Sequence, residues 1–99
     1  MIKVLSTATG GLQAATRRLA TSAHNIANVN TPGFHRHEVK ATARAEGRVD
    51  TRIERAPREG VSLEQEIVDQ IAAAASFKAN AKAIGVVERT LGRWLDERA

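Results

Sequence analysis

The sequence predicts a mainly α fold, in which two long antiparallel helices form a coiled-coil-like hairpin around a short β-hairpin-like insert. Three observations support this prediction. Apolar residues recur at helical spacing near both ends of the chain, a proline–glycine pair follows the first helical segment, and the middle alternates with a period of two. We expect a single structural unit with a first helix at 1–30, a turn and insert at 31–61, and a second helix at 62–99.

The first helical segment runs to about residue 28. A large aliphatic residue recurs along it every seven positions, at Leu5, Leu12, Leu19 and Ile26. This spacing is typical of a helix with one apolar face, and we expect Ala8, Ala15 and Ala23 to form the second half of that face. Gly10 and Gly11 interrupt the segment, and each costs about 1 kcal/mol relative to alanine in a helix interior. We therefore expect the first turns to be frayed or to need a neighbour.

A helix stop follows the first segment. Pro32 disfavours helical dihedral angles at Thr31 and has no N–H to donate. Pro32 and Gly33 fit positions i+1 and i+2 of a type II turn, where glycine supplies the positive φ. Asn28 and Asn30 are suited to capping the helix end or forming Asx turns. The sequence therefore predicts a sharp turn after the helix.

Residues 35–60 alternate with a period of two. Odd positions from Val39 to Ile53 are small or apolar, whereas even positions are mostly charged, which predicts a strand pair with one apolar face. The parity survives across Glu46-Gly47-Arg48, so the loop has odd length; a three-residue loop would pair Ala45 with Val49. A charged helix is the alternative, because alanine, arginine and glutamate are good helix formers.

The second helix is expected to begin after Ser62. Ser62 suits the N-cap, Gln65 takes the capping-box position, and Glu64 and Glu66 favour the positive helix end. From there no proline interrupts the chain. Large apolar residues follow at helical spacing, at Leu63, Ile67, Ile71, Phe77, Ile84, Leu91 and Trp94.

Two helices alone have little interior. A leucine or isoleucine contributes roughly 1.5–3 kcal/mol only when it is well buried, whereas ordering the backbone costs about 1–2 kcal/mol per residue. The second helix is also apolar nearly all round at residues 72–75. We therefore predict that both are assembly helices, with the apolar residues of the first packing against Phe77, Ile84 and Leu91 within and between copies.

Composition excludes several classes of protein. The chain has no cysteine, which excludes disulfides and thiolate zinc sites. No apolar run approaches the roughly 20 residues that span a bilayer, and the N-terminus is too short and weakly charged for a cleavable secretory signal. His35-x-His37, even with His24, lacks a carboxylate or cysteine partner for a metal. We find no serine–histidine–acid spacing and no phosphate loop, so we expect no enzyme, no cofactor and no metal.

Nucleic-acid binding is the main alternative, as a small basic helical protein with a β-ribbon. The polar face of the insert carries five basic residues, Arg36, Lys40, Arg44, Arg48 and Arg52, and a β-ribbon can read DNA. Acidic residues share that face, and no aromatic residue is available there for base stacking. A solvated face of mixed charge is therefore the preferred interpretation, and we expect no nucleic-acid partner.

The run from Ala23 to Phe34 resembles the N-terminal signature of the flagellar basal-body rod and hook proteins, the axial family. The motif and turn residues that carry the resemblance are Asn25, Ile26, Ala27, Asn28, Asn30, Thr31, Pro32, Gly33 and Phe34. The second helix is similar to the same family's C-terminal signature at 66–69, at 77–82 and at Leu91. This sequence departs from the family pattern at His24, where asparagine or serine is common, and at Phe77, where tyrosine is usual.

The resemblance implies a non-catalytic structural subunit of the bacterial flagellum. Such proteins self-assemble with copies of themselves and with other rod and hook proteins, through their paired terminal helices. They are synthesised in the cytoplasm, exported uncleaved by the flagellar type III apparatus, and located in the periplasm-spanning basal body without direct membrane insertion. The middle of about 30 residues is most like that of the short proximal rod proteins.

Overall fold

The computed structural model describes residues 2–98, and the side chains of residues 46, 97 and 98 are not described. Residues 1 and 99, with which the predicted segments begin and end, lie outside the described residues. The elements are α1 (Ile2–Ala27), β1 (His35–Ala43), the 3₁₀ turn η1 (Ala45–Gly47), β2 (Val49–Glu59) and α2 (Leu63–Arg98). The predicted mainly α fold with two long helices and a β-hairpin insert is confirmed, and the charged-helix alternative for the insert is wrong.

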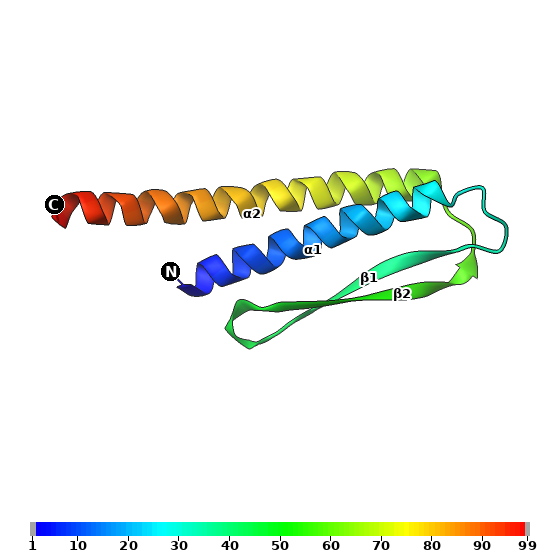
Figure 1. Cartoon of the computed structure of the whole chain (residues 1–99), viewed down its shortest axis with the longest axis horizontal. Helices are drawn as coiled ribbons and strands as arrows, with labels where there is room; N and C mark the ends of the chain where they lie inside the picture. Colours follow the sequence, from blue (N-terminus) through cyan, green and yellow to red (C-terminus); the bar gives the residue numbers. More distant parts are fainter. Residues whose placement is uncertain (1, 99) are drawn as a thin grey trace.

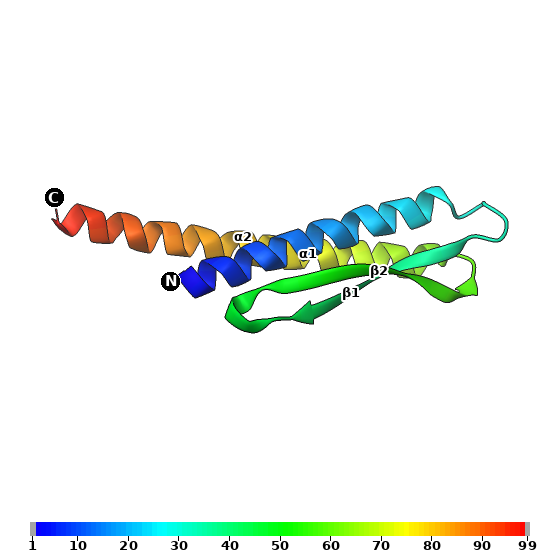
Figure 2. The same ribbon diagram turned by 60° about the horizontal axis from the view of Figure 1, so that its bottom comes forward.

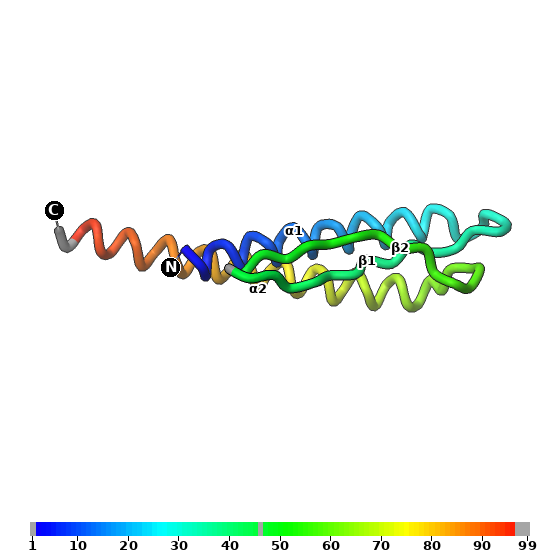
Figure 3. The backbone as a smooth tube through the Cα atoms, turned by 90° about the horizontal axis from the view of Figure 1, so that it is seen from below, coloured from blue at the N-terminus to red at the C-terminus, as the bar shows by residue number. Residues whose placement is uncertain are grey.

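The molecule is long and thin, with extents of 63 × 24 × 14 Å. α1 lies between α2 and the β-hairpin (Figure 1). The two helices run antiparallel along most of α1, and the orange-to-red end of α2 continues past the start of α1 (Figures 1 and 2). Seen from below, the hairpin lies along the helix pair and points back toward the N-terminus of α1 (Figure 3).

Small residues form the buried seam between the helices. α1 buries Ala8, Ala15 and Ser22, which are spaced by seven. α2 buries Ala73 and Val87. Small side chains let two helix backbones approach closely. The short distance between the backbones then leaves no space for a bulky side chain in the seam.

The prediction that the large apolar residues fill the contact between the two helices of one chain is therefore wrong. Leu5 is 39 % exposed, Phe77 40 % and Leu91 47 %, so these residues do not form the interior of the helix pair. Leu12, Leu19, Ile26 and Ile84 are only half-buried. The prediction followed the largest apolar residues, whereas the closest helix approach selects the smallest.

The helix stop has the predicted geometry. α1 ends at Ala27, one residue before the expected position. The Asn28 side chain donates a hydrogen bond to the His24 carbonyl at 2.9 Å, which satisfies a carbonyl of the last turn. The Phe34 N–H donates to the Thr31 carbonyl at 3.3 Å, and Gly33 has a φ of 73°. This is the predicted type II turn, with proline and glycine at its centre.

The strands form an antiparallel pair that keeps the predicted parity. Ala43 pairs with Val49, and the Arg44 N–H donates to the Arg48 carbonyl at 2.7 Å to close the loop. The loop is therefore residues 44–48 and odd in length, as predicted, but the suggested pairing of Ala45 with Val49 is wrong because Ala45 lies in the 3₁₀ turn. Near the base, the register shifts opposite Pro57, which cannot donate to a ladder.

Glycines at the N-terminal half of α1 permit close contacts on two sides. A Cβ built on Gly10 would lie 3.5 Å from the Val49 side chain, and one built on Gly11 would lie 2.5 Å from the Asn80 amide. Gly47, with a φ of 79°, packs its α-carbon against Thr7. The pair expected to weaken α1 therefore also lets the hairpin and α2 approach it.

The start of α2 is capped by Ser62. The Gln65 N–H donates to Ser62 Oγ at 3.3 Å, which confirms the predicted N-cap. The Gln65 side chain donates to Asp69 Oδ1 at 2.9 Å instead of reaching back to Ser62. The reciprocal half of the predicted capping box is therefore missing.

The glycine contacts predict opposite effects of two alanine substitutions. Gly10→Ala should raise the free energy of unfolding by about 0.5–1 kcal/mol, because alanine favours the helix and its Cβ would meet only ordinary contacts. Gly47→Ala should lower it by at least about 1–2 kcal/mol, because an L-residue is strained at positive φ and its Cβ would collide with Thr7. Urea unfolding followed by circular dichroism measures both, and effects of the same sign would contradict these contacts.

Candidate functional site

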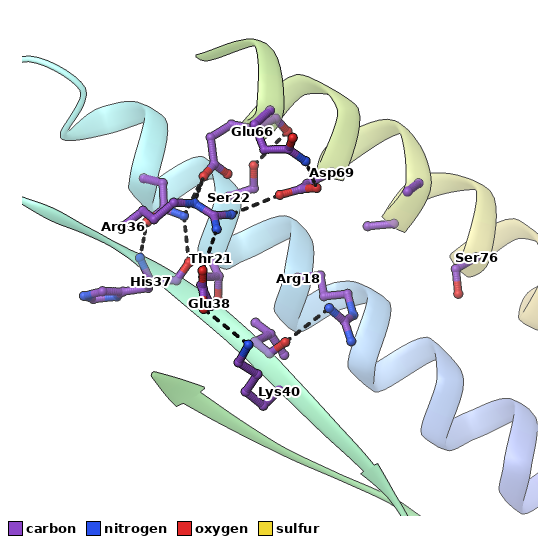
Figure 4. Close-up of a pocket in the computed structure, with 15 residues that line it drawn as sticks. Arg18, Thr21, Ser22, Arg36, His37, Glu38, Lys40, Glu66, Asp69 and Ser76 are labelled. Atoms are coloured by element: carbon purple, nitrogen blue, oxygen red, sulfur yellow. Dashed lines mark hydrogen bonds and ion pairs between the residues drawn. The ribbon is translucent and has the colours of Figure 1, made fainter. Parts of the chain in front are cut away.

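A buried polar cluster joins α1, β1 and α2 near the base of the hairpin (Figure 4). Asn25 lies at its centre and is 0 % exposed. Its Oδ1 accepts from the His37 N–H at 2.7 Å, and its Nδ2 donates to the His37 carbonyl at 2.9 Å. The amide thus bonds both backbone groups of one residue on the outer edge of β1, much as a neighbouring strand does. We expected Asn25 to be a residue of the family motif and the turn. In the structure its side chain bonds the hairpin to α1.

The same asparagine reaches α2. Asn25 Nδ2 also donates to Glu66 Oε1 at 3.0 Å, and Glu66 is 0 % exposed. Ser22, one turn earlier on α1, donates through Oγ to the Glu66 backbone carbonyl at 3.1 Å. Two turns of α1 are therefore bonded to the first turn of α2. We expected the charge of Glu66 to lie at the start of the second helix in solvent. The side chain is instead buried, because the α1–α2 contact covers it.

Arg36 from β1 neutralises the buried carboxylate. Its Nε lies 2.8 Å from Glu66 Oε1, and its two terminal nitrogens lie 3.0 Å from Asp69 Oδ2 and 3.1 Å from Glu38 Oε1. One guanidinium thus spans three carboxylates from two elements, which uses its planar fork of donors. Arg36, interpreted from the sequence as a solvated strand residue, is a structural partner of α2.

The charges around Arg36 favour its ionised form. Partial burial opposes the charge, but the hydrogen bond and charge of Glu66, together with the charges of Asp69 and Glu38, outweigh burial and raise the pKa of Arg36. A raised pKa means that this charge contributes fully to stability below the usual arginine range and loses that contribution only at higher pH. The attraction is therefore constant across neutral pH.

The hollow beside the cluster is lined by groups that bond one another. Arg18 donates to the Val39 carbonyl at 3.3 Å, and Lys40 lies 3.3 Å from Glu38. The floor consists of the small residues Thr21, Ala72, Ala73 and Ser76. Within the described residues, Glu66 Oε2 is the one buried side-chain polar atom without a hydrogen-bond partner. This arrangement stabilises a joint between three elements.

The histidines divide between two places. The rings of His24 and His37 lie 4.8 Å apart by centroid, and Phe34 lies 5.7 Å from each. His35 Nδ1 instead lies 2.8 Å from the Ala56 carbonyl, beside the register shift that separates it from His37. No group of three or more potential ligands fit to hold a metal occurs among the residues that the structure describes.

The remaining motif residues surround the turn. Thr31 donates to Asn28 Oδ1 at 3.2 Å, and Phe34 is half-buried against the His24 ring. Asn30 and Pro32 are exposed. The sequence reasoning missed Ser22, Arg36 and the carboxylate of Glu66, because each is a common exposed residue type. The available signal was the seven-residue spacing of Ala8, Ala15 and Ser22, which marks the buried side of α1.

The bulky apolar residues form an outer surface on both helices. Leu63 and Ile67 are each 47 % exposed, Ile71 is 66 % exposed and Trp94 is 59 % exposed. With Leu5, Leu12 and Leu19 of α1, they are candidates for contacts with another molecule. We call these seven residues the outer apolar surface.

The cluster predicts strong coupling between Arg36 and Glu66. Removing one partner of a buried pair typically costs about 3–5 kcal/mol, and the partial exposure of Arg36 places Arg36→Ala near the lower value. Arg36→Ala/Glu66→Ala should lose clearly less than the sum of the two single variants, because neither charge is left alone. Asn25→Ala should cost about 2 kcal/mol or more by leaving buried backbone groups unpaired. Additive losses in urea unfolding would contradict the coupling.

The comparison with known proteins agrees with the motif. Residues 5–35 match the model of a family described as flagella basal body rod protein, and the match includes most of α1, the type II turn and Asn25. No curated protein matches the chain. The matched family is a structural one and is not enzymatic. This segment, less than half of the chain, is similar to the flagellar basal-body rod protein family.

Proposed function

We propose that this rod-family subunit assembles with copies of itself and with other rod proteins through its two helices. The observation that carries the proposal is the outer apolar surface. The interior of the helix pair is filled by small residues, so the bulky residues stay outside it. Exposed apolar residues gathered on two helices are typical of interaction sites.

The gain from assembly is large compared with the stability of one chain. Ile71 is 66 % exposed and Leu63 and Ile67 are each 47 % exposed, so each retains apolar area that a neighbour can cover. Fully burying one such side chain contributes roughly 1.5–3 kcal/mol. The free energy of unfolding of a typical domain is only about 5–15 kcal/mol. A few of these contacts would therefore contribute a substantial part of that amount.

The free end of α2 supports the same proposal. Its last turns extend beyond the start of α1 (Figure 1). Leu91 and Leu95 in this part are 47 % and 71 % exposed. A helix end of this kind gains buried area only from another molecule.

The turn and the polar cluster would orient the hairpin for assembly. The type II turn sets the direction in which the chain leaves α1, and Asn25 then holds β1 against α1. We propose that the hairpin is thereby kept close to the helix pair, so that the helices can pack in a tube. The short insert supports a proximal position in the rod.

The match to the rod family supports a location in the flagellar basal body. We propose cytoplasmic synthesis followed by uncleaved export through the flagellar type III apparatus, which makes the export apparatus a further partner. Within residues 2–98, no helix is long and apolar enough to cross a membrane.

No observation favours the nucleic-acid alternative. Two of the basic residues of the hairpin are paired with acidic ones: Arg44 with Asp50 at 2.6 Å, and Arg52 with Glu54 at 2.6 Å. Arg36 is occupied by the buried cluster. This face therefore presents mixed charges and lacks the continuous positive surface that phosphate binding requires.

If the chain assembles through the outer apolar surface, a single charge introduced there should prevent polymerisation. Ile71→Glu should abolish the concentration-dependent growth of polymers, because it places a carboxylate where a neighbour packs, and should change unfolding by little because the side chain is exposed. Gln13→Glu, an exposed α1 position, introduces the same charge as a control. Light scattering and sedimentation against concentration measure the effect; wild-type chain that stays monomeric throughout would overturn the proposal.

The turn predicts a second effect on function. Pro32→Ala/Gly33→Ala should abolish motility in cells that depend on this subunit, because the turn would lose both its preset φ and its glycine at positive φ. Asn30→Ala, an exposed residue of the same turn, serves as the control. Swimming on soft agar is the measurement, with secreted protein assayed in parallel. Normal motility of the double variant would contradict the role given to the turn.

A further inference from the structure

The two outer edges of the hairpin differ. The first half of the outer edge of β1 is covered by α1, because Asn25 bonds both backbone groups of His37 and Arg18 donates to the Val39 carbonyl. The start of β2 is covered as well, because a Cβ on Gly10 would lie 3.5 Å from the Val49 backbone nitrogen. Pro57, toward the other end, has no N–H. The open part of the β2 edge therefore runs from residue 51 to residue 55.

The register shows which groups face outward from that edge. The Arg44 N–H donates to the Arg48 carbonyl, so even-numbered pairs bond within the hairpin, whereas His37 uses its backbone groups on the outside. Pairs alternate between these two states in an antiparallel ladder. The outward N–H and C=O groups of β2 are therefore those of Thr51, Ile53 and Arg55. Within the described residues, no hydrogen bond connects them to either helix.

The sequence around Ile53 is complementary to itself. We propose that this edge binds the same edge of a second copy, antiparallel and centred on Ile53. Arg52 then lies opposite Glu54 of the second copy, and Glu54 opposite its Arg52. The two Ile53 residues, each 51 % exposed in one chain, meet at the centre. Cross-strand pairs of opposite charge and of apolar residues both stabilise such a contact.

The other nearby registers are excluded. Centring on Arg52 would place two arginines opposite each other and Asp50 opposite Glu54. Centring on Thr51 would also match the charges, but it would require the backbone of Val49, beside which α1 already lies, to bond Ile53 of the second copy, whereas the register centred on Ile53 needs only the outward groups of residues 51–55. Only the register centred on Ile53 satisfies both the charge pattern and the space left by α1.

This contact differs from the proposed assembly through the helices. It uses one surface on both partners, so it closes into a dimer and cannot continue into a polymer. It also leaves the outer apolar surface free. The inference is thus independent of rod assembly, and it can be measured in the Ile71→Glu background, where helix-mediated association is blocked.

A mixing experiment in that background tests the register. Arg52→Glu places carboxylates opposite carboxylates, and Glu54→Arg places guanidinium groups opposite one another. Each variant alone should dimerise at least tenfold more weakly than the Ile71→Glu parent in sedimentation equilibrium. An equimolar mixture should recover the dimer, as heterodimers, because each cross-strand pair again joins opposite charges.

Mixing also separates the interface from effects inside one chain. Arg52 and Glu54 already form an exposed pair within each chain at 2.6 Å, and mixing cannot restore that pair. Circular dichroism confirms that each variant keeps its helices. A monomeric parent, single variants that dimerise as the parent does, or a mixture that stays monomeric would each overturn the proposal. A parent that dimerises, single variants that dimerise at least tenfold more weakly, and a mixture that recovers the dimer would together support it.

Discussion

The fold depends on one amide that bonds three elements at once. Asn25 pairs with the His37 backbone on one side and with the Glu66 carboxylate on the other. A two-stranded sheet has little stability of its own, and this one has few apolar residues facing α1. Its position therefore depends on polar bonds that α1 supplies and on Arg36, which links β1 to α2. Because these groups are buried, each must stay paired, and this requirement fixes one arrangement.

The use of small residues inside the helix pair explains the chemistry of its outside. Close approach at Ala8, Ala15 and Ala73 leaves no room for leucine in the seam. The bulky residues of both helices are displaced to neighbouring faces, where one chain cannot cover them. A monomer gains little from this arrangement, whereas an assembly gains a tight helix pair as its building unit and an apolar surface for joining units. The short distance between the two helices thus explains both the small residues inside the pair and the bulky apolar residues outside it.

The sequence was informative where structure is local. Seven-residue spacing predicted both helices, alternation predicted the strands, and Pro32-Gly33 predicted a type II turn, because each depends on nearby residues. Ala8 and Ala15 were expected in the seam and are buried there, but the polar cluster was not predicted. Arg36 and Glu66 are residue types common at exposed positions, and only their contact, 30 residues apart along the chain, reveals that Glu66 is buried and Arg36 partly buried. The choice between the leucine face and the alanine face depended on how closely the helices approach, which periodicity does not encode.

The two exposed surfaces of the molecule have different geometric consequences. In the proposed assembly, the outer apolar surface of one chain meets a different face of the next, so the contact can repeat as a tube of subunits requires. The open edge of β2 can only meet itself, so any pairing there ends at two chains. An exposed strand edge is also an aggregation hazard, and α1 covers part of the hairpin's edges at His37, Val39 and Val49. The part left open carries alternating charges about Ile53, which restrict its partners to a strand of matching pattern. The covered parts of the edges cannot pair with another strand, and the open part can pair only with a strand of matching charge pattern. Both features limit aggregation.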